Sequence, residues 1–88
     1  MKVRFKKTFL KDLKQLSPDI RKSVEDLTLN EIPAIKDIAE IKNLKKIKGY
    51  ESFYRIKLKE YRIGFEYRED TMVFMRVLHR KEIYRYFP

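Results

Sequence analysis

Three closely spaced apolar segments in the second half of the chain limit the folds that it can adopt. They read FYRIKL, YRIGFEY and MVFMRVL, at residues 53–58, 61–67 and 72–78, and each is rich in the aromatic and β-branched residues that favour strands. Only two and four residues separate them. Gaps this short allow hairpin turns but not the crossovers that parallel strands need. The sequence therefore predicts an antiparallel meander over residues 53–78.

The first half of the chain predicts one more strand and two helices. Residues 2–7 alternate Val3 and Phe5 with cations, which is the pattern of a half-buried strand. One helix is expected to begin with Thr8 as its cap, and another after Ser17, because a proline follows at its first position. Apolar residues recur at helical spacing in both, as in a helical hairpin: Phe9, Leu13 and Leu16, then Ile20, Val24 and Leu27.

The remaining segments complete a single α+β domain over residues 1–88. Pro33 interrupts the connector, and the segment LKKIKGY predicts a short strand that ends at Gly49. Residues 80–87 predict a short C-terminal helix, with Ile83 and Phe87 anchored in the core. We expect the order β-α-α-β-β-β, with the helical hairpin packed on one face of a mostly antiparallel sheet.

The positive charge of the chain indicates a polyanionic partner. Lys and Arg number 22 against 13 Asp and Glu, a net charge of +9, and such an excess costs stability through self-repulsion. Between Lys42 and Arg62 there are eight basic residues and two acidic ones. Nucleic acid is the leading candidate partner, ahead of an acidic protein or an anionic lipid surface.

Composition also points to a location. The chain contains no apolar run long enough to span a membrane, no uninterrupted signal-peptide core near its N-terminus, and no cysteine. We therefore expect a cytoplasmic protein without a membrane partner. One histidine, no thiol and scattered acids predict no metal site and no cofactor.

A turn at Lys59-Glu60 would collect basic side chains on one face of the meander. It pairs Arg55 with Gly64 and Lys57 with Arg62, and it turns Ile56, Leu58 and Ile63 to the opposite face. A second loop of odd length, centred on Asp70, would put Arg76 beside Gly64 on the basic face. The same loop would add these residues to the apolar face: Phe65, Tyr67, Val73, Met75 and Val77.

Like charges directly opposite each other destabilise a sheet. A cluster of Arg55, Lys57, Arg62 and Arg76 without matched acids therefore indicates a binding surface, although a solvated basic sheet face is the alternative. Gly64 would either let a ligand approach the sheet or mark a bulge.

The closing segment LHRKEIY places His79, Arg80 and Tyr84 next to this face. Arg80 can bind phosphate through two parallel hydrogen bonds. Tyr84 can stack on a base or hold its hydroxyl at the reacting group, although simple core packing is the alternative for this residue.

Several segments together resemble the RelE/ParE superfamily of toxins from bacterial type II toxin–antitoxin pairs. They are Gly49-Tyr50, YRIKL at 54–58, YRI at 61–63 and LHRKEIY at 78–84. The resemblance is to the RelE branch, whose members cut messenger RNA in the ribosomal A site without a metal. It implies a cognate antitoxin, messenger RNA and the ribosome as partners. The open alternatives are a ParE-like inhibitor of DNA gyrase and an RNA-binding module without catalysis.

The resemblance also implies roles for individual residues. Arg62 would stabilise the reacting phosphate, Arg80 matches the arginine that follows the last strand, and Tyr84 matches the tyrosine of the closing helix. Attack by the 2′-OH needs a group that accepts its proton, for which Tyr84, Lys57 and His79 stay open. The residues expected to bind RNA are Arg55, Arg76, Lys46, Lys48 and Lys59.

Overall fold

The computed structural model describes all of residues 1–88 as an α+β fold built on a five-stranded sheet. The strands are β1 (Lys2–Phe5), β2 (Leu44–Lys46), β3 (Phe53–Leu58), β4 (Tyr61–Arg68) and β5 (Thr71–His79). The helices are α1 (Lys7–Lys14), α2 (Pro18–Glu25) with a π-helical continuation (Asp26–Glu31), and α3 (Ile83–Tyr86), while single 3₁₀ turns lie at Ile32–Ala34 and Ile38–Glu40. The strand order is β1-β5-β4-β3-β2, and only the β1–β5 pair is parallel. The predicted fold class is confirmed, but the observed order has four strands after the hairpin rather than the three of β-α-α-β-β-β, because the short strand β2 joins the sheet beside β3.

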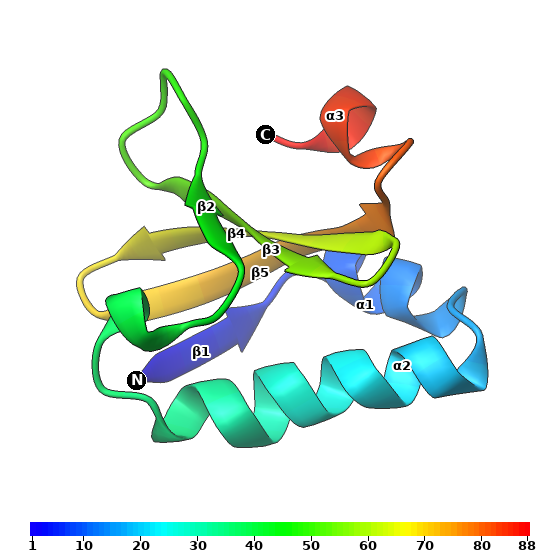
Figure 1. The fold of residues 1–88 in the computed structure, drawn as a ribbon, viewed down its shortest axis with the longest axis horizontal. Coiled ribbons are helices and arrows are strands. Elements are labelled where there is room, and N and C mark those ends of the chain that lie inside the picture. Colours follow the sequence, from blue (N-terminus) through cyan, green and yellow to red (C-terminus); the bar gives the residue numbers. More distant parts are fainter.

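The helical hairpin and the C-terminal helix lie on opposite faces of the sheet. Figure 1 shows α1 and α2 on one side, and α3 and the loop between β2 and β3 rising from the other. The core lies between the hairpin and the sheet, where Phe9 of α1 packs against Phe74 of β5 with 5.6 Å between ring centroids. Each such fully buried side chain contributes about 1.5–3 kcal/mol. The face with α3 is therefore the only face of the sheet open to a ligand.

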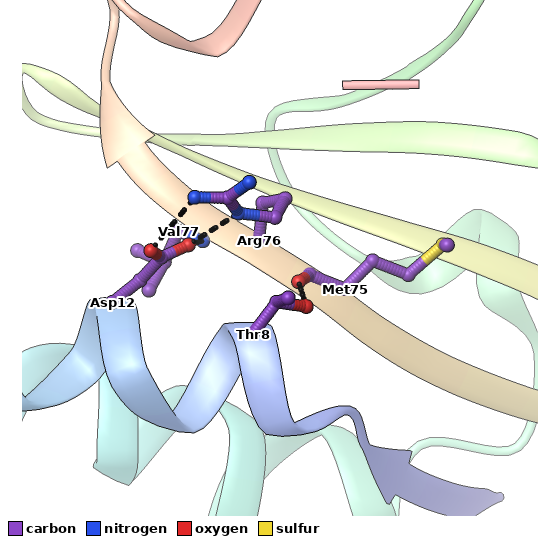
Figure 2. Close-up of polar contacts among 5 residues, drawn as sticks. All are labelled: Thr8, Asp12, Met75, Arg76 and Val77. Carbon is purple, nitrogen blue, oxygen red and sulfur yellow. Dashed lines mark hydrogen bonds and ion pairs between the residues drawn. The ribbon is translucent and has the colours of Figure 1, made fainter. Parts of the chain in front are cut away.

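Helix α1 also covers an exposed part of the edge of β5. Strand β1 pairs with β5 only as far as Phe74, so the later peptide groups of β5 need other partners. The Thr8 hydroxyl donates to the carbonyl of Met75 at 2.8 Å, and Val77 N–H donates to the Asp12 carboxylate at 3.1 Å (Figure 2). Thr8 therefore sits inside α1, and its expected role as the helix cap is wrong, because Lys6 holds that position. Helix α2 begins directly after Ser17, as predicted.

The β3–β4 hairpin has the predicted register. Arg55 lies opposite Gly64, Lys57 opposite Arg62 and Leu58 opposite Tyr61, around a turn at Lys59-Glu60. Strand β2 ends at Lys46 rather than at Gly49, because the backbone turns away at Gly49 with φ of +87°.

The β4–β5 hairpin differs from the prediction. Its turn contains two residues, Glu69 and Asp70, whose φ angles of 48° and 59° suit a tight hairpin turn. The loop is therefore even rather than odd, so Met72 and Phe74 face the core, and the assignment of Val73 and Met75 to that face is wrong.

A β-bulge then restores the predicted register. The pairing shifts between Gly64 and Phe65, which leaves one extra residue on β5 at Met75. Beyond the bulge, Gly64 lies opposite Arg76 and Ile63 opposite Val77, as expected.

The C-terminal segment lies directly on the open face of the sheet. Ile83 and Phe87 are 1% and 5% exposed, so both predicted anchors are confirmed. A Cβ atom on Gly64 would come within 2.6 Å of the Phe87 ring, so Gly64 makes room for this segment rather than for a ligand. Helix α3 begins only at Ile83, because residues 80–82 form a turn in which Glu82 N–H donates to the carbonyl of His79. None of the helices has the length and apolar character that crossing a membrane requires.

Candidate functional site

A cleft of about 290 Å³ opens on the face of the sheet that the hairpin does not cover. Its lining comes from β2, β3, β4 and α3 and from Asn43 just before β2. Arg55, Lys57, Arg62 and Tyr84, all predicted site residues, meet there. The complete lining is Asn43, Leu44, Lys45, Arg55, Lys57, Arg62 and Tyr84.

Strand alternation explains why these cations share one face. Arg55 and Lys57 are two residues apart on β3, Arg62 faces Lys57 from β4, and Lys45 faces Arg55 from β2. The three ion pairs of the protein involve other residues. Arg55, Lys57 and Arg62 therefore have no acidic partner in the structure. Their mutual repulsion favours an anionic ligand in the cleft.

Backbone carbonyls hold the side chain of Arg62 in place. Its Nη1 donates to the carbonyls of Lys59 and Tyr61, at 2.9 and 3.0 Å. Lys59 belongs to the β3–β4 turn, and Tyr61 is the first residue of β4. The remaining N–H groups of the guanidinium are left for a ligand, and a preorganised donor of this kind stabilises charge that develops on a phosphate.

Tyr84 projects into the open rather than into the core. The residue is 71% exposed, so the alternative of core packing is wrong for Tyr84. The guanidinium carbon of Arg55 lies 4.7 Å from the centroid of its ring. This cation–π contact holds the phenol over the cleft.

Arg80 lies beside the β3–β4 turn and is paired with an acid that the sequence pattern does not single out. Its Nε is 2.5 Å from a carboxylate oxygen of Glu60, and its backbone N–H donates to the Glu60 carbonyl at 2.7 Å. Arg80 holds the pKa of Glu60 below its ordinary value, and His79 and Arg62 add to this effect, while desolvation opposes it. Three cationic or titratable side chains therefore lie near Glu60. They come together there only because the end of β5 pairs with the start of β4, next to the β3–β4 turn.

Arg76 has a structural partner, so its predicted membership of an unpaired cluster is wrong. It donates from Nε and Nη2 to the two carboxylate oxygens of Asp12, at 2.7 and 3.0 Å (Figure 2). Hydrogen bonding to Asp12 raises the pKa of Arg76 further, although burial opposes this. The guanidinium also lies 5.3 Å from the ring centroid of Tyr86 in α3. Arg76 therefore links α1, β5 and α3 and does not line the cleft.

The other predicted residues lie outside the cleft. His79 pairs with Tyr61 on the face that the hairpin covers, with 5.5 Å between the ring centroids, so the register separates it from Arg62. Lys59 occupies the turn with φ of 55° and is exposed. Lys46 and Lys48 line an adjoining hollow between the loop and α3.

Sequence reasoning did not single out Asn43, Leu44 and Lys45 as site residues, although all three line the cleft. Lys45 lies in the cleft because it pairs with Arg55. Predicting its place would have required the pairing register of β2 with β3. No group of three or more His, Asp or Glu side chains is arranged to hold a metal ion.

Comparisons with known proteins show which proteins this chain is similar to. The sequence model of a family described as the ParE toxin of the type II toxin–antitoxin system parDE matches residues 3–84. Toxin RelE3 of Methanocaldococcus jannaschii is 51% identical over 89 residues, covering 100% of both chains.

Solved structures show the same fold. The toxin of a RelB–RelE antitoxin–toxin complex from Methanococcus jannaschii superposes with a TM-score of 0.81 at 47% identity, over 97% of this chain and 99% of that one. The RelBE2 complex of Mycobacterium tuberculosis gives a TM-score of 0.72 at 23% identity, over 90% of this chain and 96% of that one.

Proposed function

This chain belongs to the RelE/ParE superfamily, as the RelE-like toxin of a toxin–antitoxin pair, and we propose that it is a metal-independent endoribonuclease that cuts messenger RNA in the ribosomal A site. The observation that supports this most is the cleft that brings Arg55, Lys57, Arg62 and Tyr84 together without a matched acid. Such a site suits a phosphodiester, which is anionic in the ground state and more so in the transition state.

The reaction follows from the chemistry of RNA. The 2′-OH attacks the adjacent phosphorus, the bond to the 5′-oxygen breaks, and the products are a 2′,3′-cyclic phosphate and a 5′-OH end. One group must take the proton of the 2′-OH, and another must protonate the departing 5′-oxygen. Arg62, held by its two carbonyl contacts, stabilises the charge on the phosphorane oxygens.

Tyr84 and Lys57 are the proton-transfer candidates that line the cleft. His79 is the third candidate, but its place on the opposite face of the sheet does not support a direct role. Arg80 binds the RNA backbone at the edge of the cleft when a phosphate replaces Glu60 as its ion-pair partner. This exchange is feasible because a guanidinium binds carboxylates and phosphates in the same two-bond geometry.

The partner of the toxin is a RelB-like antitoxin, by analogy with the RelB–RelE complex of M. jannaschii. We infer that the antitoxin silences the toxin by covering the basic cleft or by displacing α3, and that the toxin acts on ribosomes in the cytoplasm. A partner bound only to a remote surface, with the cleft open and cleavage still blocked, would contradict this docking mode.

Primer extension on a reporter messenger RNA in a translation extract tests the nuclease. Wild type should create new 5′ ends of downstream fragments at ribosomal A sites, and these should disappear when initiation is blocked. Arg62→Ala should lose them by a factor of about 10² or more. Arg68→Ala is the matched control, because this arginine lies at the far end of β4 with its side chain 73% exposed and paired only with Glu66. Full cleavage by Arg62→Ala would refute the assigned site.

A ParE-like inhibitor of DNA gyrase is the second candidate, because the family model that matches residues 3–84 describes a ParE toxin. In that case, growth arrest should survive both Arg62→Ala and Tyr84→Phe, and no cut messenger RNA should appear. Loss of toxicity together with loss of cleavage would exclude this alternative.

A further inference from the structure

The loop between β2 and β3 forms a second hollow next to the cleft. This loop hollow measures about 420 Å³ and is lined by Lys45, Lys46, Ile47, Lys48, Gly49 and Tyr50. A third hollow of about 250 Å³ joins the two, since it shares Lys45, Arg55 and Tyr84 with the cleft and residues 45–48 with the loop hollow. Figure 1 shows this loop rising on the same face of the sheet as α3. The three hollows therefore adjoin one another, through shared lining residues, from Arg62 to Tyr50.

Tyr50 is an exposed aromatic residue held in place by its neighbours. Its ring meets Phe53 edge-on, with 5.5 Å between centroids and 69° between planes, while 48% of the residue stays exposed. Phe53 in turn meets the buried Phe87 edge-on at 5.7 Å. The orientation of the Tyr50 ring is thus set before any ligand arrives, which lowers the entropy cost of stacking.

The lining of the loop hollow is also strongly basic, because the last two residues of β2 and Lys48 of the loop are lysines. Lys45, Lys46 and Lys48 are exposed, and none of them takes part in an ion pair. Glu51 is the one acid in this loop and is likewise unpaired. Lysines around an exposed aromatic ring are the combination by which proteins hold single-stranded nucleic acid, with phosphates on the cations and bases on the ring.

We propose that the loop hollow binds a nucleotide that flanks the reacting phosphate of single-stranded RNA, with its base stacked on Tyr50 and its phosphate near Lys45 and Lys48. The assignment of the reacting phosphate to Arg62 rests on the proposed nuclease function. Lys57, opposite Arg62, and Phe53, which contacts Tyr50, are four residues apart on β3, or about 13 Å. The bound base is therefore a neighbour of the reacting nucleotide. Stacking is tolerant of sequence, so this subsite adds affinity without selecting a codon.

Binding of an RNA that cannot react tests the subsite. The probe is a fluorescent, fully 2′-O-methylated oligonucleotide of about six nucleotides, which has no free 2′-OH to attack. Tyr50→Ala should weaken its binding, measured by anisotropy, about tenfold. Tyr50→Phe keeps the ring and should stay within about twofold of wild type. No binding by wild type, unchanged binding by Tyr50→Ala, or an equal loss in Tyr50→Phe would each overturn the proposal.

The salt dependence tests the lysines independently of Tyr50. Lys45→Gln combined with Lys48→Gln should lower the slope of log K against log salt by about 1.4, because each phosphate that a lysine neutralises on a single strand adds about 0.7 to that slope. Lys11→Gln, an exposed lysine on α1 at the other face, should leave the slope unchanged. An unchanged slope in the double variant would overturn the phosphate assignment.

The binding experiment separates failure of the subsite from failure of the nuclease. If oligonucleotide binding depends on Tyr50 but the protein cuts no messenger RNA, the subsite is supported and the nuclease function is refuted. Cleavage of messenger RNA with no effect of Tyr50→Ala on binding would do the reverse.

Discussion

Replacing Asp12 with alanine should destabilise the protein by about 3 kcal/mol, because one carboxylate serves three donors. It accepts from Nε and Nη2 of Arg76 and from the backbone N–H of Val77, at 2.7, 3.0 and 3.1 Å (Figure 2). The side chains of Arg76 and Asp12 are 24% and 10% exposed. The substitution therefore strands a largely buried guanidinium at the edge of the sheet.

The magnitude follows from this burial. Breaking a fully buried ion pair costs about 3–5 kcal/mol, whereas a fully exposed pair is worth about 0–1 kcal/mol. Since these side chains are mostly but not fully buried, about 2 kcal/mol is expected from the pair. The unsatisfied N–H of Val77 adds about 1 kcal/mol. Asp12→Asn keeps an oxygen acceptor and should lose about 1–2 kcal/mol.

Urea unfolding followed by circular dichroism measures the loss, and the melting temperature should fall by about 12–24 °C. Asp26→Ala is the control, because this acid is exposed and forms no ion pair, and it should change stability by less than about 0.5 kcal/mol. A double-mutant cycle with Arg76→Met should give a coupling energy of about 2 kcal/mol. Additive effects in that cycle, or a loss below about 0.5 kcal/mol in Asp12→Ala, would refute the reasoning.

Three further predictions concern the sheet, the turn and the cleft. Gly64→Ala should lower stability by about 1–3 kcal/mol in thermal unfolding, because the added Cβ would lie 2.6 Å from the Phe87 ring. Adding Phe87→Leu should recover part of this loss, and no recovery would contradict the clash as its cause. The folded pKa of Glu60 is depressed, so the stabilisation from its Arg80 pair is present above the ordinary value of 4.5 and is lost as pH falls through the lower folded value. The difference in melting temperature between wild type and Glu60→Gln should therefore be present at neutral pH and vanish in acid, and a constant difference would argue against the pair. Tyr84→Phe should keep wild-type stability, since Tyr84 is 71% exposed, and single-turnover cleavage should slow by about 10² or more if its hydroxyl transfers a proton. Full activity would leave Lys57 as the remaining candidate in the cleft.

The sequence alone was enough to predict which segments form helices and strands, although not all of their ends, and to predict the register of the β3–β4 hairpin. Alternation along residues 53–58 and 61–67, joined by a two-residue gap, placed Lys57 opposite Arg62 and Arg55 opposite Gly64, as observed. These relations are local, because a short turn sets the register and the period of two then sets the face of every side chain. The basic character of the open face followed from the same pattern.

The second hairpin shows where local reasoning fails. Both Glu69 and Asp70 adopt positive φ, which made the turn even rather than odd in length, and the bulge at Met75 then compensated. The hydrophobic pattern does not predict where a non-glycine residue adopts positive φ, nor where a strand carries a bulge.

The tertiary structure decided which cations are available. Arg76 follows the same alternation as Arg62, but its Asp12 partner lies 64 residues away in the chain and only the packing of α1 against the edge of β5 brings them together. In the same way, Phe87 explains Gly64, and the pairing of β2 with β3 adds Lys45 to the cleft. The sequence determined which face would carry the charges, because neighbours along a strand alternate. Packing between distant segments determined which of those charges stay unpaired, because local sequence patterns do not show which distant segments come into contact.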